Sequence, residues 1–468
     1  MKRAIAIALG VGALVGSAHV VHADDPKIPF EKYKLANGLE VILAPDPSIP
    51  LVAVNVWYHV GSGDEVPGKS GFAHLFEHMM FQGSKNVGAD QHFPVLRKLG
   101  ADNVNGTTNT DRTNYYEVVP SNQLETGLWL ESDRMSHLLD ILDKSELDNQ
   151  IDVVRNEKRQ NYDNAPYNKA RFALQAALYP EGHPYRYFTI GKHEDLTTAS
   201  LEDVKDFYRT WYVPANATLT LVGDFEVAAT KRLVDKWFGS FPISVKPTVV
   251  DVPAPVAKPQ QLAVADPFAK LRQITFAWHS PAMFAPGDAE LDFVATALGR
   301  EGTGRLYKAL VFDKPLAQSV RANQGGQGFS GTFQITVSLR TGADVAAVQQ
   351  IVLDEVAKVT REDLTAKEMS RLVVAQEAGA IRELESVNGR ANVLQNYNHF
   401  LADPDKITFD LDRYRKATPE QVRASAAKYL GPAHLVTVVT TPAAETAMPA
   451  TTGTTGPTGT TGLMGRDK

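Results

Sequence analysis

Residues 72–82 read Phe-Ala-His-Leu-Phe-Glu-His-Met-Met-Phe-Gln, and His74, Glu77 and His78 form the pattern His-x-x-Glu-His within them. Two residues four apart on a helix project from one face on successive turns, so both imidazoles can bind one Zn²⁺ ion. Glu77 borders the same face and is a candidate general base. The order is the inverse of the commoner metal motif His-Glu-x-x-His. The stretch therefore predicts a metal site, and the alternative is an amphipathic helix that carries two histidines by chance.

The composition is that of an ordinary globular protein, with 43% hydrophobic and 22% charged residues in a chain of 468. This length is sufficient for two or three domains. The formal net charge is −6 and basic residues are not clustered, so nucleic acid is not an expected partner. Cysteine is absent, so a metal must be held by His, Asp or Glu.

The first 23 residues have the features of an export signal. Lys2 and Arg3 precede an apolar run over residues 4–15, and Val-His-Ala at 21–23 resembles a cleavage site. The apolar run is too short to span a membrane, which disfavours an uncleaved anchor. We expect residues 1–23 to be removed after Ala23, leaving a soluble chain with no membrane partner. Its most plausible location is the periplasm.

The pattern of strands and helices predicts an α+β fold made of two similar domains, because strand-rich segments precede several helices in both halves. Residues 242–259 are rich in Pro and Val, which is typical of a linker. Residues 325–331 are rich in glycine and predict a loop before the strand over 332–339. The predicted divisions are an N-terminal metal-binding domain at 24–242, a linker at 243–262, a C-terminal domain at 263–445 and a disordered Thr/Gly-rich tail at 446–468.

Residues 101–120 are polar and rich in threonine, and they predict two strands joined by a turn near Asp111. A polar strand suits the edge of a sheet, where one row of backbone groups has no neighbouring strand. The segment Asn105-Gly106-Thr107-Thr108 lies in the first of these strands. Its simplest reading is a solvated hairpin.

A catalytic zinc ion takes three protein ligands and keeps one position open. His74 and His78 would supply two, so the third must come from another element. Glu157 follows the apolar pair Val153-Val154 and can therefore lie near the buried edge of its helix. From the residues alone, Glu157 is one acid among many.

Several blocks resemble one family in the same order along the chain. They are residues 71–84 around the motif, Val-Val-Arg-Asn-Glu at 153–157, His-Pro-Tyr-Arg at 183–186, Ile-Gly at 190–191, Tyr-Val-Pro-Ala-Asn-Ala-Thr at 212–218 and Val-Gly-Asp-Phe at 222–225. In these blocks the chain is similar to the M16 metallopeptidases, the family of pitrilysin, insulin-degrading enzyme and mitochondrial processing peptidase. The resemblance is to the short two-domain bacterial type and extends over roughly residues 30–440.

The resemblance implies a fold, a cofactor and roles for particular residues. Each domain would be a mainly antiparallel sheet with helices packed on one face, and the chain would form half of a clamshell. Glu157 would be the third ligand of one Zn²⁺ ion per chain. The strand that contains Asn105, Gly106, Thr107 and Thr108 would pair with an extended peptide, because the family binds substrate on this edge strand.

The chain departs from the family pattern at two places. Gln150 stands where many members carry an acid seven residues before the third ligand. In the second half, Val311 and Gln318 occupy the positions of an arginine and a tyrosine that hold substrate in the family. We therefore expect a second M16-like subunit to supply that pair, with a homodimer as the fallback.

The expected function is that of a zinc-dependent endopeptidase that hydrolyses peptides or unfolded segments inside a closed chamber, with Glu77 as general base. Two alternatives stay open at this stage. One is a maturation peptidase that acts on a single precursor. The other is a non-catalytic M16-like subunit with a structural or assembly role, which the intact His74, Glu77, His78 and Glu157 disfavour.

Overall fold

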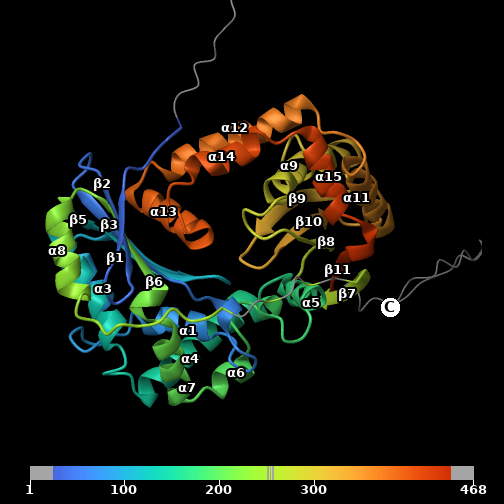
Figure 1. The fold of residues 1–468 in the computed structure, drawn as a ribbon. Coiled ribbons are helices and arrows are strands. Elements are labelled where there is room, and N and C mark those ends of the chain that lie inside the picture. Colours follow the sequence, from blue (N-terminus) through green and yellow to red (C-terminus); the bar gives the residue numbers. More distant parts are fainter. Residues whose placement is uncertain (1–24, 250–251, 253–254, 256–257, 444–468) are drawn as a thin grey trace, which may run out of the picture.

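The computed structural model describes residues 25–443 apart from 250–251, 253–254 and 256–257. The predicted signal peptide and the tail at 446–468 lie outside these residues. Two sheets form the centres of two halves that stand side by side, with the helices α12 (Ala366–Glu383) and α14 (Ile407–Arg415) extending between them along one side (Figure 1).

The first sheet has six strands in the order β1-β2-β6-β3-β5-β4. Its β2–β6 pair is parallel and its other pairs are antiparallel. Strand β4 is the outermost strand at one edge, as the polar sequence predicted. The strands are β1 (Glu31–Lys34), β2 (Glu40–Pro45), β3 (Leu51–Tyr58), β4 (Asp102–Thr108), β5 (Thr113–Pro120) and β6 (Ala217–Gly223).

The second sheet has five strands in the order β7-β11-β8-β10-β9. Its β7–β11 pair is parallel and the others are antiparallel. The order repeats that of the first sheet from β2 to β4, so that β9 corresponds to the edge strand β4. The predicted α+β class with two similar, mainly antiparallel halves is therefore confirmed. The strands are β7 (Gln260–Asp266), β8 (Gln273–Ser280), β9 (Ala317–Gly326), β10 (Gly331–Leu339) and β11 (Val436–Pro442).

Two details of the second half differ from the sequence-based expectation. Strand β7 begins at Gln260, inside the segment 243–262 that was predicted as a linker. Strand β9 was not predicted, because its burial alternates only weakly and it ends in the Gly325-Gly326 pair. The glycine-rich loop is shorter than expected as a result, and it connects β9 to β10.

Most helices lie on the outer sides of the two sheets, some against the strands and others against neighbouring helices (Figure 1). In the first half these helices are α1 (Phe72–Met79), α2 (His92–Lys98), α3 (Leu124–His137), α4 (Lys144–Lys158), α6 (His193–Thr197), α7 (Leu201–Trp211) and α8 (Val227–Phe238). In the second half they are α9 (Asp288–Gly299), α10 (Arg305–Tyr307), α11 (Val345–Val359) and α15 (Pro419–Tyr429).

The two halves exchange one helix each, which the sequence did not predict. Helix α5 (Asn168–Leu178) belongs to the first half in sequence but packs against β7 and β11 of the second sheet. Helix α13 (Val387–Leu401) belongs to the second half but packs against β3 and β6 of the first sheet (Figure 1). Each sheet is thus covered on its second face by a helix from the other half.

The contact between α13 and the first sheet combines apolar and polar groups. Leu394 is 1% exposed and lies in a cluster with Ile42 and Val222 of the sheet. Beside it, the Gln395 amide donates to the carbonyl oxygens of Asn55 at 3.1 Å and Thr218 at 2.8 Å. These two hydrogen bonds favour one orientation of the helix, because another register would leave the buried N–H groups of Gln395 without partners.

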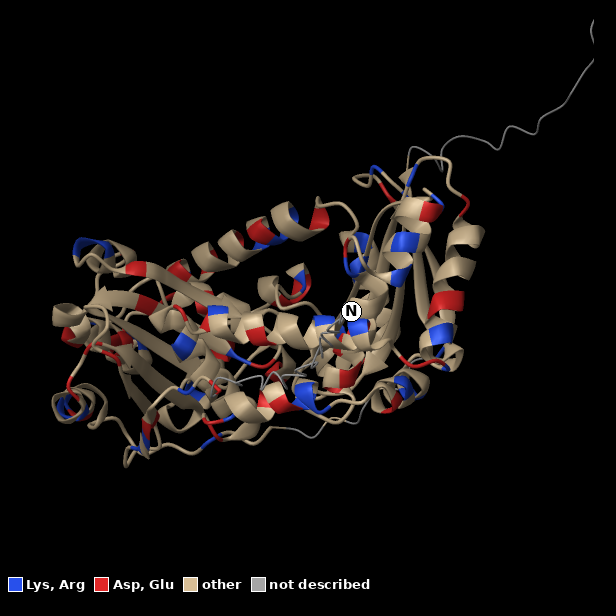
Figure 2. Cartoon of the chain, turned by 90° about the horizontal axis from the view of Figure 1, so that it is seen from above, with Lys and Arg blue, Asp and Glu red and all other residues tan. Residues whose placement is uncertain are grey.

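Charged side chains of both signs are interspersed over the helices (Figure 2), in keeping with a formal net charge of −6. Within the described part of the chain, no helix combines the length and hydrophobicity needed to cross a bilayer.

The docking of α13 on the first sheet can be tested with Leu394→Ala. Removing a buried leucine side chain should lower the free energy of unfolding by about 2–5 kcal/mol. The matched control is Val374→Ala on α12, where the side chain is 59% exposed, and it should change stability by less than about 0.5 kcal/mol. Chemical denaturation measures both. Equal, small effects would contradict the helix exchange.

Candidate metal centre

Helix α1 carries the His-x-x-Glu-His pattern, and its start is held by a carboxylate from an earlier loop. Gly71 precedes the helix with φ 93°, a left-handed conformation that favours glycine. The Glu65 carboxylate accepts hydrogen bonds from the backbone N–H groups of Gly71 and Ala73, each at 2.9 Å. The hydroxyl of the preceding Ser70 donates to Asp195 at 2.5 Å. Glu65 thus satisfies the helix N-terminus from six residues upstream.

The two faces of α1 have different roles. Its buried side chains include Phe72, Leu75 and Phe76, which belong to the core of the first half. The Phe76 ring stacks on Phe207 of α7 with the ring centroids 5.4 Å apart. This apolar face fixes the rotation of the helix about its axis, so the histidines are directed towards α4.

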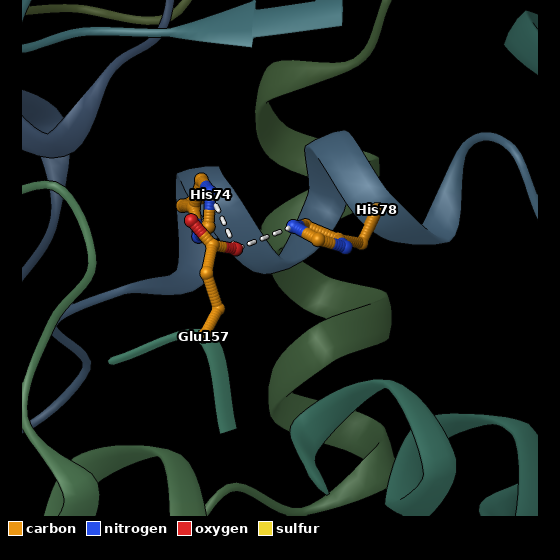
Figure 3. A group of neighbouring side chains, drawn as sticks. All are labelled: His74, His78 and Glu157. Carbon is orange, nitrogen blue, oxygen red and sulfur yellow. Dashed lines mark ion pairs between the residues drawn. The ribbon is translucent and has the colours of Figure 1, made fainter. Parts of the chain in front are cut away.

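Helix α4 brings Glu157 to the two histidines (Figure 3). The distance from Glu157 Oε2 to His78 Nε2 is 3.3 Å, and that to His74 Nε2 is 3.7 Å. The candidate ligand atoms of the three residues all lie within 4.8 Å of one another. Among the described residues, this is the one group of three or more His, Asp or Glu side chains that could hold a metal ion.

The spacing of these atoms fits zinc. Ligands bound at about 2.0–2.1 Å in a tetrahedral arrangement lie about 3.4 Å apart, and both measured N–O distances are close to that value. Two imidazoles and one carboxylate also leave a fourth position open, as catalytic zinc sites do. The side chains are partly exposed, so a substrate can reach them.

The surroundings favour the protonation states that metal binding needs. Burial, together with the neighbouring His78, lowers the pKa of His74 to about 4, although Glu157 opposes the shift. His74 is therefore neutral near pH 7, with an imidazole nitrogen available. The hydrogen bond from His78 holds the pKa of Glu157 below its ordinary value, so that its carboxyl group is ionised.

Glu77 lies between this cluster and the edge strand β4. The Thr108 hydroxyl donates to Glu77 Oε2 at 2.6 Å. Burial raises the pKa of Glu77 above its ordinary value, and the Thr108 bond partly offsets the rise. A carboxylate with a raised pKa is suited to taking and returning a proton near neutral pH. The Thr108 side chain is thus engaged by Glu77, and the substrate-binding role of Thr108 stays a prediction.

The close contact between α1 and β4 depends on Gly106. A Cβ atom at this position would lie 3.1 Å from Glu77 Cγ and 3.0 Å from the Phe81 ring. Gly106 and Thr108 face α1, and Thr107 between them faces the opposite side of the sheet, where it donates to Asn114. Residues two apart on a strand share a face, so this alternation was available from the sequence.

The free edge of β4 can be identified from its pairing with β5. Asn109 N–H donates to the Arg112 carbonyl at 3.0 Å, so these two residues form a hydrogen-bonded pair. Two residues further along the strands, Thr107 is paired with Asn114. Antiparallel hydrogen-bonded pairs alternate, so the backbone groups of Gly106 and Thr108 point away from β5. Gly106 N–H is covered by the side-chain oxygen of Asn105 at 2.9 Å. The Asn105 side chain thus accepts from the Gly106 N–H group, which a peptide paired with β4 would otherwise use as a donor.

A cavity of about 330 Å³ continues from the end of β4 towards the second half. Thr108 and the β4–β5 turn line one side, Arg171 and Gln175 of α5 line another, and Gln334 of β10 lies across from them. A chain lying along β4 would therefore meet both halves of the molecule.

The residues at the departures from the family pattern are located as follows. Gln150 is 4% exposed on α4, two turns before Glu157. Val311 lies in the π-helix Lys308–Asp313 and packs against the second core. Gln318 is an exposed residue at the start of β9, the strand that corresponds to β4. Neither Val311 nor Gln318 belongs to the histidine cluster.

Two family models match the chain. A model described as "Insulinase (Peptidase family M16)" matches residues 40–186, and one described as "Peptidase M16 inactive domain" matches residues 198–374. His74, Glu77, His78 and Glu157 all lie within the first matched segment.

Individual relatives agree with these matches. The zinc protease PqqE of Helicobacter pylori is 27% identical over 384 residues, which are 81% of this chain and 85% of that protein. The crystal structure of a protease from Helicobacter pylori superposes with a TM-score of 0.80 at 26% identity, covering 89% of this chain and 100% of that one. The periplasmic protease PqqL from Escherichia coli has a TM-score of 0.75 at 17% identity, with 91% of this chain covering 49% of that one.

The fold and these relatives define a protein of the zinc-protease class with a half-clamshell architecture. The chain belongs to peptidase family M16.

The hydrogen bond between Thr108 and Glu77 predicts a change in the pH profile. The Thr108 hydroxyl stabilises the ionised form of Glu77, so Thr108→Val should raise the pKa of Glu77 further. The acidic limb of kcat/KM should then move to higher pH, because the base is protonated over a wider range. Thr108→Ser keeps the hydroxyl and should keep the profile. A profile unchanged in Thr108→Val would contradict the role of this bond.

Proposed function

We propose that the chain is a zinc-dependent endopeptidase that hydrolyses peptides or unfolded segments. The observation that carries this proposal is the meeting of His74, His78 and Glu157 beside Glu77 at the free edge of β4. Three metal ligands, a base and a strand edge are the components that peptide hydrolysis needs in one place.

His74 Nε2, His78 Nε2 and Glu157 Oε2 would hold the ion. When bound, zinc acidifies water and polarises the carbonyl group that is attacked. Glu77 accepts a proton from the attacking water at its carboxylate and returns that proton to the leaving amine. Thr108 holds this carboxylate in place during both transfers. Burial raises the pKa of Glu77 above its ordinary value, which favours uptake of this proton by the carboxylate.

Substrate would bind by adding a strand to β4. The backbone groups of Gly106 and Thr108 face outward, and Asn105 releases the Gly106 N–H when a substrate carbonyl replaces its side-chain oxygen. Backbone hydrogen bonds do not discriminate between side chains, so this binding mode suits peptides of varied composition. It also requires an extended substrate, which excludes residues inside a folded domain.

We further propose that a second M16-like subunit completes the chamber. Val311 and Gln318 lack the guanidinium and phenol groups expected from the family resemblance, so a partner would supply them. The chain also accounts for only 49% of the length of PqqL, which supports a closed form made of two such halves. A homodimer is the fallback arrangement.

The alternatives have less support. A non-catalytic subunit has no need of a base hydrogen-bonded beside three candidate ligands. A peptidase for a single precursor would use the same site, and the sequence-neutral edge of β4 favours the broader substrate range. The export signal expected at residues 1–23 would place this activity in the periplasm, and PqqL is also described as periplasmic.

Two isosteric variants separate metal binding from catalysis. Glu77→Gln should keep zinc while lowering kcat by about 10²–10⁴-fold, the usual contribution of a general base. Losing a residue that only hydrogen-bonds to a metal ligand weakens metal binding by roughly 10–100-fold. Glu157→Gln changes a ligand itself, so it should weaken zinc binding by more than that. Metal content after dialysis against a chelator and peptide cleavage are the measurements.

The matched control for these variants is Glu146→Gln, on the first turn of the same helix as Glu157. It should leave metal content unchanged. Full zinc occupancy in Glu157→Gln would remove Glu157 from the site, and retained cleavage in Glu77→Gln would remove Glu77 as the base.

The partner proposal predicts that cleavage depends on assembly. Purified alone, the chain should cleave peptides poorly because another subunit supplies the substrate-holding groups, and in the homodimer arrangement its specific activity should fall on dilution. Adding a related chain that carries the arginine and tyrosine should restore it. Specific activity that stays constant on dilution of the single chain would contradict the requirement for a partner.

A further inference from the structure

Helix α13 covers only part of the inner face of the first sheet. Between that helix and the edge strand lies a cavity of about 430 Å³. Side chains of β3, β4 and β5 and of the β4–β5 turn line its sheet side, and α13 and the end of α12 line the other. The sheet-side residues are Trp57, Thr107, Arg112, Asn114 and Tyr116.

Arg112 is the cation in this cavity, and its partners are neutral. Its Nη1 donates to the Thr107 carbonyl at 2.7 Å and to the Asn114 side-chain oxygen at 3.1 Å. The guanidinium carbon lies 5.0 Å from the centroid of the Trp57 ring. Its Nε is buried and has no hydrogen-bond partner among the described residues. Burial lowers the pKa of Arg112 to about 10, so the group is still charged near pH 7.

A desolvated cation with an unused donor is unfavourable unless a partner arrives. A carboxylate matches the remaining N–H groups best, because guanidinium and carboxylate form charge-assisted and often bidentate hydrogen bonds. The amide groups of Asn392 and Asn396 on α13 line the same cavity and can hydrogen-bond a carboxylate or an amide. The site is therefore polar, with one fixed positive charge.

The cavity opens beside the strand on which substrate would lie. Thr107 of β4 lines it, whereas Gly106 and Thr108 face the metal cluster. A peptide paired with β4 alternates its side chains in the same way. Every second side chain is then directed away from α1 and towards Arg112.

We propose that this cavity is a specificity pocket for an acidic side chain of the bound peptide, with Arg112 as the residue that selects it. The proposal rests on the peptidase function proposed above and on strand addition at β4. Glu383 also lines the cavity but is exposed at the end of α12, so solvent screens its charge more than that of Arg112.

The pocket can be tested by binding, independently of catalysis. In the zinc-loaded Glu77→Gln chain, fluorescent peptides of one sequence carry Glu or the isosteric Gln at each position in turn. At one position the Glu peptide should bind about tenfold tighter or more, as expected for a hydrogen-bonded charge pair. Adding Arg112→Gln should bring the Glu/Gln ratio to about one.

Two further variants guard against a structural effect of the substitution. Arg112→Lys keeps the positive charge but cannot make all the hydrogen bonds that Arg112 makes within the β4–β5 hairpin. It should keep part of the Glu/Gln selectivity. Arg209→Gln removes an arginine on the exposed face of α7, where it pairs with Glu202 and Asp206, and should leave the ratio unchanged. Zinc content and the unfolding midpoint are measured for each variant.

The outcomes separate this pocket from the proposed function. Cleavage by the unmodified chain with no Glu/Gln selectivity in binding would overturn the pocket and leave the peptidase. Selective binding without any cleavage, with or without a partner chain, would overturn the peptidase and leave the pocket. A preference for Lys that Glu383→Gln abolishes would overturn the role of Arg112.

Discussion

The close approach of helix α1 to strand β4 at Gly106 is the contact on which the site depends. Because this position has no Cβ atom, the Glu77 side chain passes within reach of the Thr108 hydroxyl at 2.6 Å. The same approach places the histidines of α1 next to a strand edge whose backbone groups point away from β5. Behind this contact, Arg134 lies 4.4 Å from the centroid of the Tyr115 ring and 5.2 Å from that of Phe81. The Tyr115 hydroxyl also donates to the Phe76 carbonyl of α1 at 3.1 Å, so buried aromatic packing and a polar contact together hold the helix against the sheet.

The second half of the chain contributes to this geometry without supplying a metal ligand. Helix α13 covers one face of the first sheet, and α5 covers one face of the second. The turn after β4 is also tied across the halves, because Asp111 accepts hydrogen bonds from the Tyr185 hydroxyl at 2.6 Å and from Gly328 N–H at 3.1 Å. The turn at the tip of the edge strand is thus held by residues distant in sequence. This explains how a polar, glycine-containing strand can keep a defined position at the edge of a sheet.

Local patterns predicted much of the fold. The alternation and polarity of residues 101–120 indicated β4 and β5 and the edge position of β4, and the repeated order of strands and helices indicated duplication. Strand β9 was missed because it carries few buried apolar residues, so its sequence lacks the period of two that marks a half-buried strand. The helix exchange was missed for a different reason. Residues such as Leu394 and Leu174 mark an apolar face, but a face alone does not specify which sheet it will cover.

By itself, the sequence determined which side chains could act together within one element: His74, Glu77 and His78 on one helix, and Gly106 and Thr108 on one side of a strand. These relations follow from the 3.6- and 2-residue periods of the backbone. Only the tertiary structure decided that Glu157 meets the histidines, that His74 is desolvated, and that Arg112 lies beside the substrate edge without a carboxylate partner. Such contacts join segments many residues apart, and they are set by how the apolar faces of helices and sheets pack together, which no local pattern encodes.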